Sequence, residues 1–170
     1  MEFELIKVSN GTKEYPGNFT KREIEIIKEN IKGLTLHLFS GKSDIGNLRI
    51  DFNYSNECNC TMNVFDYLND TNNLIDKFET IIIDAPYNQK FGDKYQKIGD
   101  TPKQFIIFAN TKDTTILFNK VIEFNPEIII LKSWNYYMVK GYYLKKGYIC
   151  YPGGYRKSTL LIIMEKIRQN

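Results

Sequence analysis

The stretch Phe78-Glu79-Thr80-Ile81-Ile82-Ile83-Asp84 decides the fold of this chain. Its apolar residues run almost without interruption until the acidic Asp84 ends them. A strand buried on both faces of a sheet has this composition, because side chains on both faces then meet apolar surroundings. Such strands belong to parallel sheets that are covered by helices, so the stretch predicts an α/β protein.

The flanking sequence supplies elements that agree with this sheet. Residues 20–32 predict a helix, because Thr20 can cap it and Glu23 completes a capping box. A second helix is expected over residues 114–124, and a third should begin at Ser133 and run through Met138 and Leu144. Further strands are predicted at residues 34–39, 48–52, 60–62 and 127–131, and an antiparallel hairpin at residues 148–151 and 158–164.

Length and composition indicate one domain over residues 1–170. Of these 170 residues, 42% are hydrophobic and 25% charged, which is ordinary for a globular chain. No apolar run approaches the roughly 20 residues that cross a bilayer, and the acidic start does not resemble a secretory signal. We therefore expect a cytoplasmic protein without a membrane partner. The cysteines, Cys58, Cys60 and Cys150, and the single His37 predict neither a disulfide framework nor a metal site.

Charge is unevenly distributed along the chain. Residues 1–84 hold 9 Lys and Arg against 14 Asp and Glu, whereas residues 85–170 hold 14 against 6. A basic half on a nearly neutral chain suggests a face that meets an anionic partner such as nucleic acid. The alternative is a solvated lysine-rich surface without a partner.

Small and acidic residues follow three of the predicted strands. Ser40-Gly41 follows the first, Asp51 ends the second, and Asp84-Ala85-Pro86-Tyr87 follows the central one. Open α/β sheets bind ligands beyond the carboxyl ends of their strands, where a glycine permits close approach and a carboxylate can accept hydrogen bonds from ribose. Gly41-Lys42-Ser43 is not a phosphate-binding P-loop, because Leu36 stands where that motif needs a glycine.

These segments carry a family resemblance. Leu38-Phe39-Ser40-Gly41, then Asp51, then Asn63-Val64-Phe65-Asp66-Tyr67-Leu68 and Ile81-Ile82-Ile83-Asp84-Ala85-Pro86-Tyr87 resemble class I S-adenosylmethionine-dependent methyltransferases. They are most similar to the amino-methylating branch that includes adenine-specific DNA methylases, although Ala85 replaces the first proline of the D-P-P-Y type motif. The resemblance implies a Rossmann-like methyltransferase sheet, closed here by the C-terminal antiparallel hairpin.

The resemblance also implies roles for individual residues. S-adenosylmethionine would be the methyl donor, and methyl transfer to an exocyclic amine of adenine in DNA or RNA the reaction. The catalytic residues would be Asp84, Pro86 and Tyr87. The donor would be bound by Phe19, Phe39, Ser40, Gly41, Asp51 and Asn63.

The chemistry of methyl transfer suits the Asp84 segment. An exocyclic amine is a poor nucleophile because its lone pair is delocalised into the ring. Hydrogen bonds from the amine to the Asp84 carboxylate and to a carbonyl of Ala85 or Pro86 would aim the nitrogen at the donor. Pro86 would stiffen the turn, and Tyr87 would stack on a base that is unpaired or flipped out. The structural alternative makes Asp84 a helix cap or turn residue and Tyr87 a core aromatic.

A basic and aromatic set of side chains in the C-terminal half suits an unpaired nucleic-acid strand. The predicted contacts are Lys132, Trp134, Lys145, Lys146, Arg156 and Lys157. Packing of the neighbouring tyrosines against the hairpin is the alternative explanation for the aromatics. A non-catalytic nucleic-acid-binding or assembly protein that retains a degenerate fold is the alternative function.

The predicted strands leave little room for connections on the first-strand side. Only residues 41–47 and about 53–58 separate the first three strands, whereas a parallel crossover normally takes roughly 10–12 residues or more. The sheet is therefore expected to lack two helices on that side, or to pair differently. Uncovered strands would expose Leu36 or Leu38, and a homodimer could then cover them. In the competing arrangement, the helix over residues 20–32 and the N-terminal segment cover this face and leave a monomer.

Overall fold

The computed structural model describes residues 2–8, 19–52, 58–70, 72, 77–86, 111–153 and 157–168. Eight strands and three helices lie in this part of the chain. The elements in chain order are β1 (Phe3–Lys7), α1 (Lys21–Asn30), β2 (Thr35–Leu38), β3 (Leu48–Asp51), β4 (Cys60–Thr61), α2 (Val64–Asn69), β5 (Thr80–Ile83), α4 (Thr111–Glu123), β6 (Ile128–Ser133), β7 (Tyr142–Tyr151) and β8 (Thr159–Lys166).

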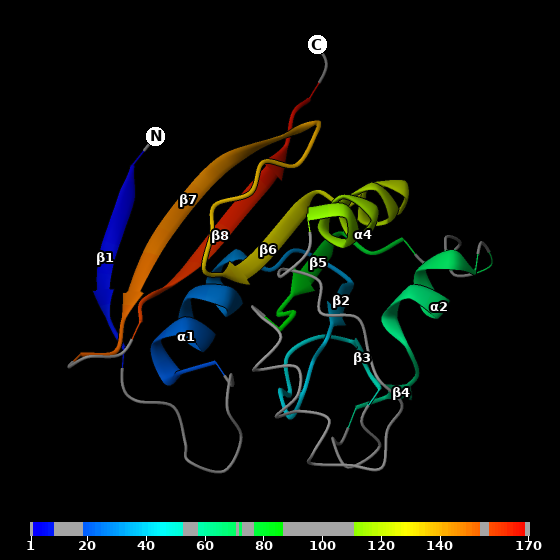
Figure 1. The fold of residues 1–170 in the computed structure, drawn as a ribbon, viewed down its shortest axis with the longest axis horizontal. Helices are drawn as coiled ribbons and strands as arrows, with labels where there is room; N and C mark the ends of the chain where they lie inside the picture. Colours follow the sequence, from blue (N-terminus) through cyan, green and yellow to red (C-terminus); the bar gives the residue numbers. More distant parts are fainter. Residues whose placement is uncertain are drawn as a thin grey trace.

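The strands form one mixed sheet in the order β1-β7-β8-β6-β5-β2-β3-β4 (Figure 1). Among the described strands, every pairing is parallel except the two that β8 makes, with β6 and with β7. The central strand β5 lies between β2 and β6, and each of its four residues is buried. The α/β class and the C-terminal antiparallel hairpin predicted from the sequence are confirmed.

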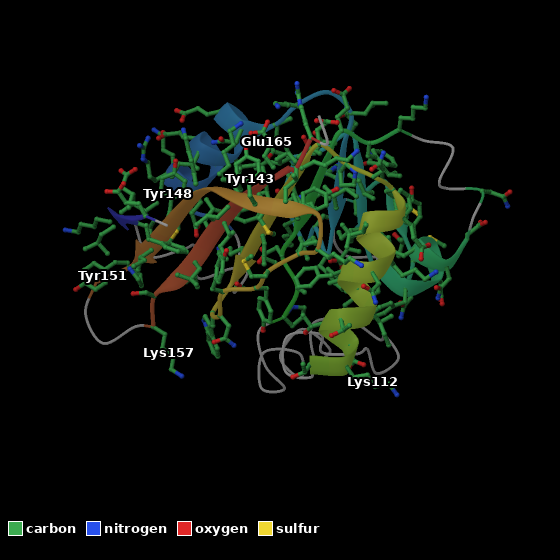
Figure 2. The ribbon with its side chains drawn as sticks, turned by 90° about the horizontal axis from the view of Figure 1, so that it is seen from above. Lys112, Tyr143, Tyr148, Tyr151, Lys157 and Glu165 are labelled. Atoms are coloured by element: carbon green, nitrogen blue, oxygen red, sulfur yellow. The ribbon has the colours of Figure 1, made fainter. Side chains whose placement is uncertain are left out.

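Helices cover the sheet on both faces. On one face, Ile26 and Ile27 of α1 pack with Ile82 of β5 in one cluster of the core. On the other face, α2 and α4 pack in a second cluster with residues such as Ile81 and Ile83. Figure 2 shows α1 and α4 on opposite sides of the strands. Adjacent residues of β5 therefore face different clusters, which explains why its sequence is continuously apolar.

The helix and strand predictions hold for most of the chain. The helix at α1 has the predicted capping box: the Thr20 hydroxyl accepts from the Glu23 backbone N–H, and the Glu23 carboxylate accepts from the Thr20 N–H at 2.7 Å. The predicted helix after Ser133 is wrong, because β6 extends to Ser133 and β7 begins at Tyr142. Neither β1 nor α2 was predicted from the sequence.

The edge strand β1 depends on a glycine in its neighbour. Phe3 pairs with Gly147 of β7, and a Cβ added at Gly147 would lie 2.5 Å from the Phe3 ring. The missing side chain therefore makes room for the phenylalanine. The short, polar-flanked sequence Phe3–Lys7 does not by itself indicate that it pairs with β7. The pairing depends on Gly147, which is far away in the chain.

The short connections from β2 to β3 and from β3 to β4 both join parallel strands. No helix lies between β2 and β3. The loop of residues 39–47 is held by side chains instead: Asn47 Oδ1 accepts from the Thr35 N–H at 2.9 Å, and Arg49 Nη1 donates to the Ser43 carbonyl at 3.0 Å. Ile45 of this loop is 4% exposed and belongs to the same core cluster as α1. The sequence predicted that no helix would cover this part of the sheet, and this loop covers it instead.

Leu36 and Leu38 are fully buried, so the prediction that they are exposed is wrong. They pack in the cluster that contains residues of α2 and α4, whereas α1 covers the opposite face. The predicted homodimer loses its structural reason and stays untested. No helix in the described part of the chain is long and apolar enough to cross a membrane. The cytoplasmic location stays a prediction.

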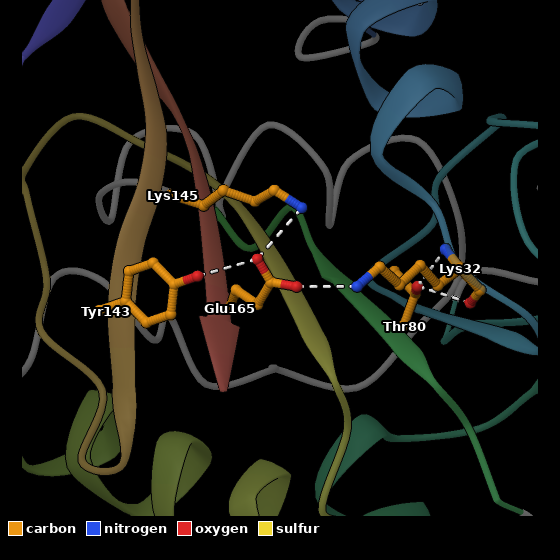
Figure 3. Close-up of polar contacts among 5 residues, drawn as sticks. All are labelled: Lys32, Thr80, Tyr143, Lys145 and Glu165. Atoms are coloured by element: carbon orange, nitrogen blue, oxygen red, sulfur yellow. Dashed lines mark hydrogen bonds and ion pairs between the residues drawn. The ribbon is translucent and has the colours of Figure 1, made fainter. Parts of the chain in front are cut away.

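An ion-pair cluster joins α1 to the hairpin at the end of the sheet where β5 and β6 begin (Figure 3). Glu165 of β8 accepts from Lys32 Nζ at 2.7 Å, from Lys145 Nζ at 3.2 Å and from the Tyr143 hydroxyl at 3.0 Å. These three donors, beginning with Lys32, lower the pKa of Glu165 to about 2. Because Lys32 follows α1, this carboxylate connects elements that are distant in sequence.

We expect Glu165→Gln to lower the free energy of unfolding by about 1 kcal/mol at pH 7, since the paired lysines are partly exposed to solvent. The pKa of Glu165 is below the ordinary carboxyl value in the folded state, so this stabilisation is present above about pH 4 and is lost as the pH falls through about 2. Urea unfolding at pH 7 and pH 3 measures the difference. Glu123→Gln is the control, because Glu123 pairs with Lys120 on the exposed side of α4. Equal effects of the two variants would contradict this role of Glu165.

The only histidine lies in the core beneath α1. His37 Nδ1 donates to the Ile45 carbonyl at 2.9 Å, and its Nε2 has no partner among the described residues. Burial, as the largest cause, lowers the pKa of His37 to about 4. The neutral ring thus helps to hold the loop that replaces a helix.

This pKa predicts a loss of stability in mild acid. The unfolded chain takes up a proton near pH 6.5 and the folded chain only near pH 4, so the free energy of unfolding falls over this range, by about 2 kcal/mol between pH 7.5 and 5. His37→Asn keeps a donor for Ile45 but cannot titrate. Urea unfolding should give a steep pH dependence for the wild type and a shallow one for the variant. Parallel pH profiles would show that His37 is not the cause.

Candidate functional site

The carboxyl ends of β2, β3 and β5 meet at one edge of the sheet. Leu38 pairs with Ile83 at the ends of β2 and β5, and Asp84 N–H then donates to the Leu38 carbonyl at 3.3 Å. After β2 the chain crosses to β3 through the loop that packs on the α1 face. After β5 it continues to α4 on the other face. The connections after the adjacent strands β2 and β5 thus run on opposite faces of the sheet. Open α/β sheets bind their ligands at such a point.

The backbone after β2 has an unusual shape. Phe39 has φ 59° and Gly41 has φ 53°, in the left-handed region that side chains other than glycine rarely adopt. Ser40 N–H donates to the Ile50 carbonyl at 3.1 Å, which fixes this turn against β3. A strained residue held in place by its neighbours is common at binding sites, because the surrounding structure must compensate for it.

Asp51 joins the loop to the end of β3. Its carboxylate Oδ2 accepts from the Gly41 N–H at 2.9 Å, and its side chain is buried, with 5% exposure. The structure therefore brings together two of the residues that the sequence analysis assigned to one site. It also gives Asp51 a structural function, which the sequence analysis did not foresee.

Ser40 adds a buried hydroxyl to the same edge. The residue is 4% exposed, and its Oγ has no hydrogen-bond partner among the described residues. A buried polar atom without a partner is costly, by about 1–3 kcal/mol, so such an atom calls for an explanation. A bound ligand that hydrogen-bonds to Oγ would remove this cost.

Asn63 and Phe19 lie in different surroundings. Met62 N–H donates to the Asp51 carbonyl at 3.0 Å, so Asn63 follows directly beside the end of β3. The Asn63 side chain caps α2 by accepting from the Phe65 N–H at 2.8 Å. Phe19 is 8% exposed and packs at the start of α1, with its ring centroid 5.7 Å from that of His37. Asn63 thus lies near the predicted site, whereas Phe19 is a core side chain.

The segment predicted to be catalytic continues β5 at this edge. Asp84 and Pro86 are half-buried, and Ala85 is buried in the cluster beneath α2 and α4. Tyr87 lies outside the described residues, as does the segment 88–104. The structural alternative for Asp84 and Tyr87 therefore stays open.

Lys132 is not part of an exposed basic surface. It is 5% exposed, and its Nζ lies 3.3 Å from Glu23 Oε2 and 4.9 Å from the centre of the Phe19 ring. Burial and the nearby Glu23 raise the pKa of the Cys150 thiol beside this pair to about 12. The capping box identified Glu23 as a helix residue, but nothing in the local sequence identified its second partner, 109 positions away.

The other predicted nucleic-acid contacts do not form one continuous surface. Lys145 pairs with Glu165 at the end of the sheet where β6 begins, since Glu165 lies opposite Ile128. Trp134 follows the carboxyl end of β6, and the Lys157 ammonium lies 4.8 Å from the centre of its ring. Figure 2 shows Glu165 and Lys157 well apart, near opposite ends of β8. Lys146 is exposed on β7, and Arg156 lies outside the described residues.

Within the described ranges, no three His, Cys, Asp or Glu side chains lie close enough together to hold a metal ion. Cys58 before β4 and Cys60 within it are half-buried, whereas His37 and Cys150 are buried under α1.

Comparisons of this chain with models of protein families, with curated proteins and with solved structures find no match.

Proposed function

We propose that this protein transfers a methyl group from S-adenosylmethionine to an exocyclic amine, that of adenine in DNA or RNA. The observation that supports this proposal is that the segments after β2 and β5 meet at one edge of the sheet. Asp84 N–H donates to the Leu38 carbonyl at 3.3 Å, so Asp84-Ala85-Pro86 starts beside Phe39-Ser40-Gly41. A donor segment and an acceptor segment must adjoin in this way for direct transfer between two bound molecules.

The order of the strands supports this proposal. If β2 is numbered 1 and the strands after it are numbered along the chain, β4, β3, β2, β5 and β6 become strands 3, 2, 1, 4 and 5. Their order in the sheet is then 3-2-1-4-5, which is that of doubly wound nucleotide-binding sheets. The antiparallel β8 then separates β6 from β7, which departs from the fully parallel arrangement. This order supports the proposal of a Rossmann-like methyltransferase sheet that is closed by a hairpin.

The residues at the edge fit the methyl donor. Gly41 has no side chain and lets a ligand approach its backbone, Ser40 offers a buried hydroxyl without a described partner, and Asp51 offers a carboxylate at the end of β3. Held by Ser40, Gly41 and Asp51, S-adenosylmethionine would supply an electrophilic methyl carbon, and its sulfur would keep the electron pair of the broken bond when the amine nitrogen takes the methyl group. Asp84 would accept a hydrogen bond from the amine and orient its lone pair. The amine proton would leave to Asp84 or to water.

A non-catalytic nucleic-acid-binding protein is the second candidate. The observation that favours it is the hydrogen bond from Gly41 to Asp51, because a buried carboxylate that holds its own loop has a structural reason to be there without any donor. The two candidates differ in one measurable property, which is binding of the donor or of its demethylated product.

We expect Asp51→Asn to weaken binding of the demethylated donor by about tenfold to a hundredfold, the range for losing a hydrogen bond to a charged group. The asparagine oxygen can still accept from the Gly41 N–H, so the loop stays closed while the charge is lost. Calorimetry measures the affinity, and urea unfolding checks that the fold is retained. Asp66→Asn on the exposed side of α2 is the control. Absence of donor binding by the wild type would favour the second candidate.

We expect Asp84→Ala to reduce methyl transfer by about a hundredfold or more, with donor affinity nearly unchanged, because Asp84 acts on the acceptor. Asp84→Asn should recover part of the activity, since the amide oxygen can still accept from the amine. Transfer of labelled methyl groups to oligonucleotides measures the rate. An Asp84→Ala variant that fails to fold, with Asp84→Asn folded and fully active, would support the structural alternative for Asp84.

A further inference from the structure

An aromatic ring and a cation from distant parts of the chain lie together at the carboxyl edge of the sheet. The Lys157 ammonium, from the segment before β8, lies 4.8 Å from the centre of the Trp134 ring, which follows β6. Lys157 is exposed and Trp134 is half-buried. Such a contact at the surface contributes only about 0.5–1 kcal/mol, so stability alone is a weak reason for it.

This pair, Trp134 and Lys157, adjoins the segment that the proposed function makes catalytic. Ile83 of β5 pairs with Leu131 of β6 in parallel register. The segment with Asp84 begins directly after Ile83, and Trp134 directly follows the end of β6. Neighbouring strands are about 4.8 Å apart, so the two segments leave the sheet from adjacent strands at the same edge.

The turn that carries Trp134 is fixed by a buried hydroxyl. Ser133 is fully buried at the end of β6, and its Oγ donates to the Asn135 carbonyl. This bond links the residues on both sides of Trp134 and so fixes the backbone that carries the indole. A rigid aromatic loses little conformational entropy when another ring stacks on it.

We propose that Trp134 and Lys157 bind an unpaired nucleotide next to the acceptor, with the base stacked on the indole and its phosphate paired with the ammonium. Stacking plus a phosphate contact is how proteins hold single strands, and the more basic half of the chain supplies both side chains. The site rests on the proposed function for its substrate class. It also confines the nucleic-acid contacts to this edge, because Lys145 is engaged by Glu165 at the other end of the sheet.

Trp134 is the only tryptophan of the chain, so its fluorescence reports directly on this site. The probe is a single-stranded oligodeoxyadenylate of about ten nucleotides, within the usual site size for such strands, with the matching oligoriboadenylate as a second arm. We expect saturable quenching by at least one of the two strands, and much weaker quenching by a DNA duplex of the same length. Either arm supports the site and identifies the preferred sugar.

Charge and ring are then tested separately. Lys157→Gln should weaken binding about threefold to tenfold and lower the salt slope by about one phosphate contact, whereas Lys28→Gln, at an exposed position of α1, should leave both unchanged. With a labelled oligonucleotide, anisotropy should show a loss of about tenfold for Trp134→Ala and little loss for Trp134→Phe, which keeps a stacking ring. Unchanged Trp134 emission at saturation, equal effects of the two lysine variants, or quenching by the duplex as strong as by the strands would overturn the proposal.

These outcomes are independent of the donor. Quenching by an oligonucleotide in a protein that does not bind the demethylated donor would overturn methyl transfer and leave the nucleotide site in place. Methylation of the oligonucleotide at the same rate in wild type and Trp134→Ala, with no quenching in the wild type, would overturn the nucleotide site alone.

Discussion

The hydrogen-bonded ladder between β2 and β5 is the constraint on which the rest of the structure depends. It pairs Thr35 to Leu38 with Thr80 to Ile83 in parallel, with every one of these residues buried. The connection from β2 to β3 packs on one face and α4 on the other, and the first residues after β2 and β5 lie at a common edge. The turn at Ser40-Gly41, the bond from Gly41 to Asp51 and the start of the Asp84 segment all inherit their positions from this ladder.

Sequence patterns predicted the features that local chemistry determines. The continuous apolar run before Asp84 identified a strand buried on both faces, and Thr20 with Glu23 identified the start of α1. The helix predicted after Ser133 was wrong because a serine also closes tight turns, and here its hydroxyl bonds to the Asn135 carbonyl while the strand partner β8 extends β6. A capping signal indicates a bend in the chain, and tertiary pairing decides whether a helix or a strand comes after that bend.

The candidate site was predictable only in part for the same reason. Phe39, Ser40, Gly41, Asp51 and Asp84 follow strand ends, and strand ends of parallel neighbours meet at one edge by geometry. The basic residues lacked such a rule, since a lysine is recruited by whichever carboxylate the fold brings close. Lys132 is buried against Glu23 and Lys145 is held by Glu165, so charge counted along the chain did not locate a surface.

The loop of residues 39–47 has an electrostatic consequence, because it crosses from β2 to β3 without a helix. Doubly wound sheets usually place a helix amino terminus there, whose partial positive charge holds the phosphates of dinucleotides. In this loop the charges of Lys42 and Asp44 cancel, and the positive charge of Arg49, which donates to the Ser43 carbonyl, is outnumbered by Asp51 at the end of β3 and Asp84 after β5. A diphosphate would find little compensation at such an edge, whereas a ligand with a positive sulfonium would be attracted. Under the proposed function, the absence of this helix would favour a positively charged ligand over a diphosphate.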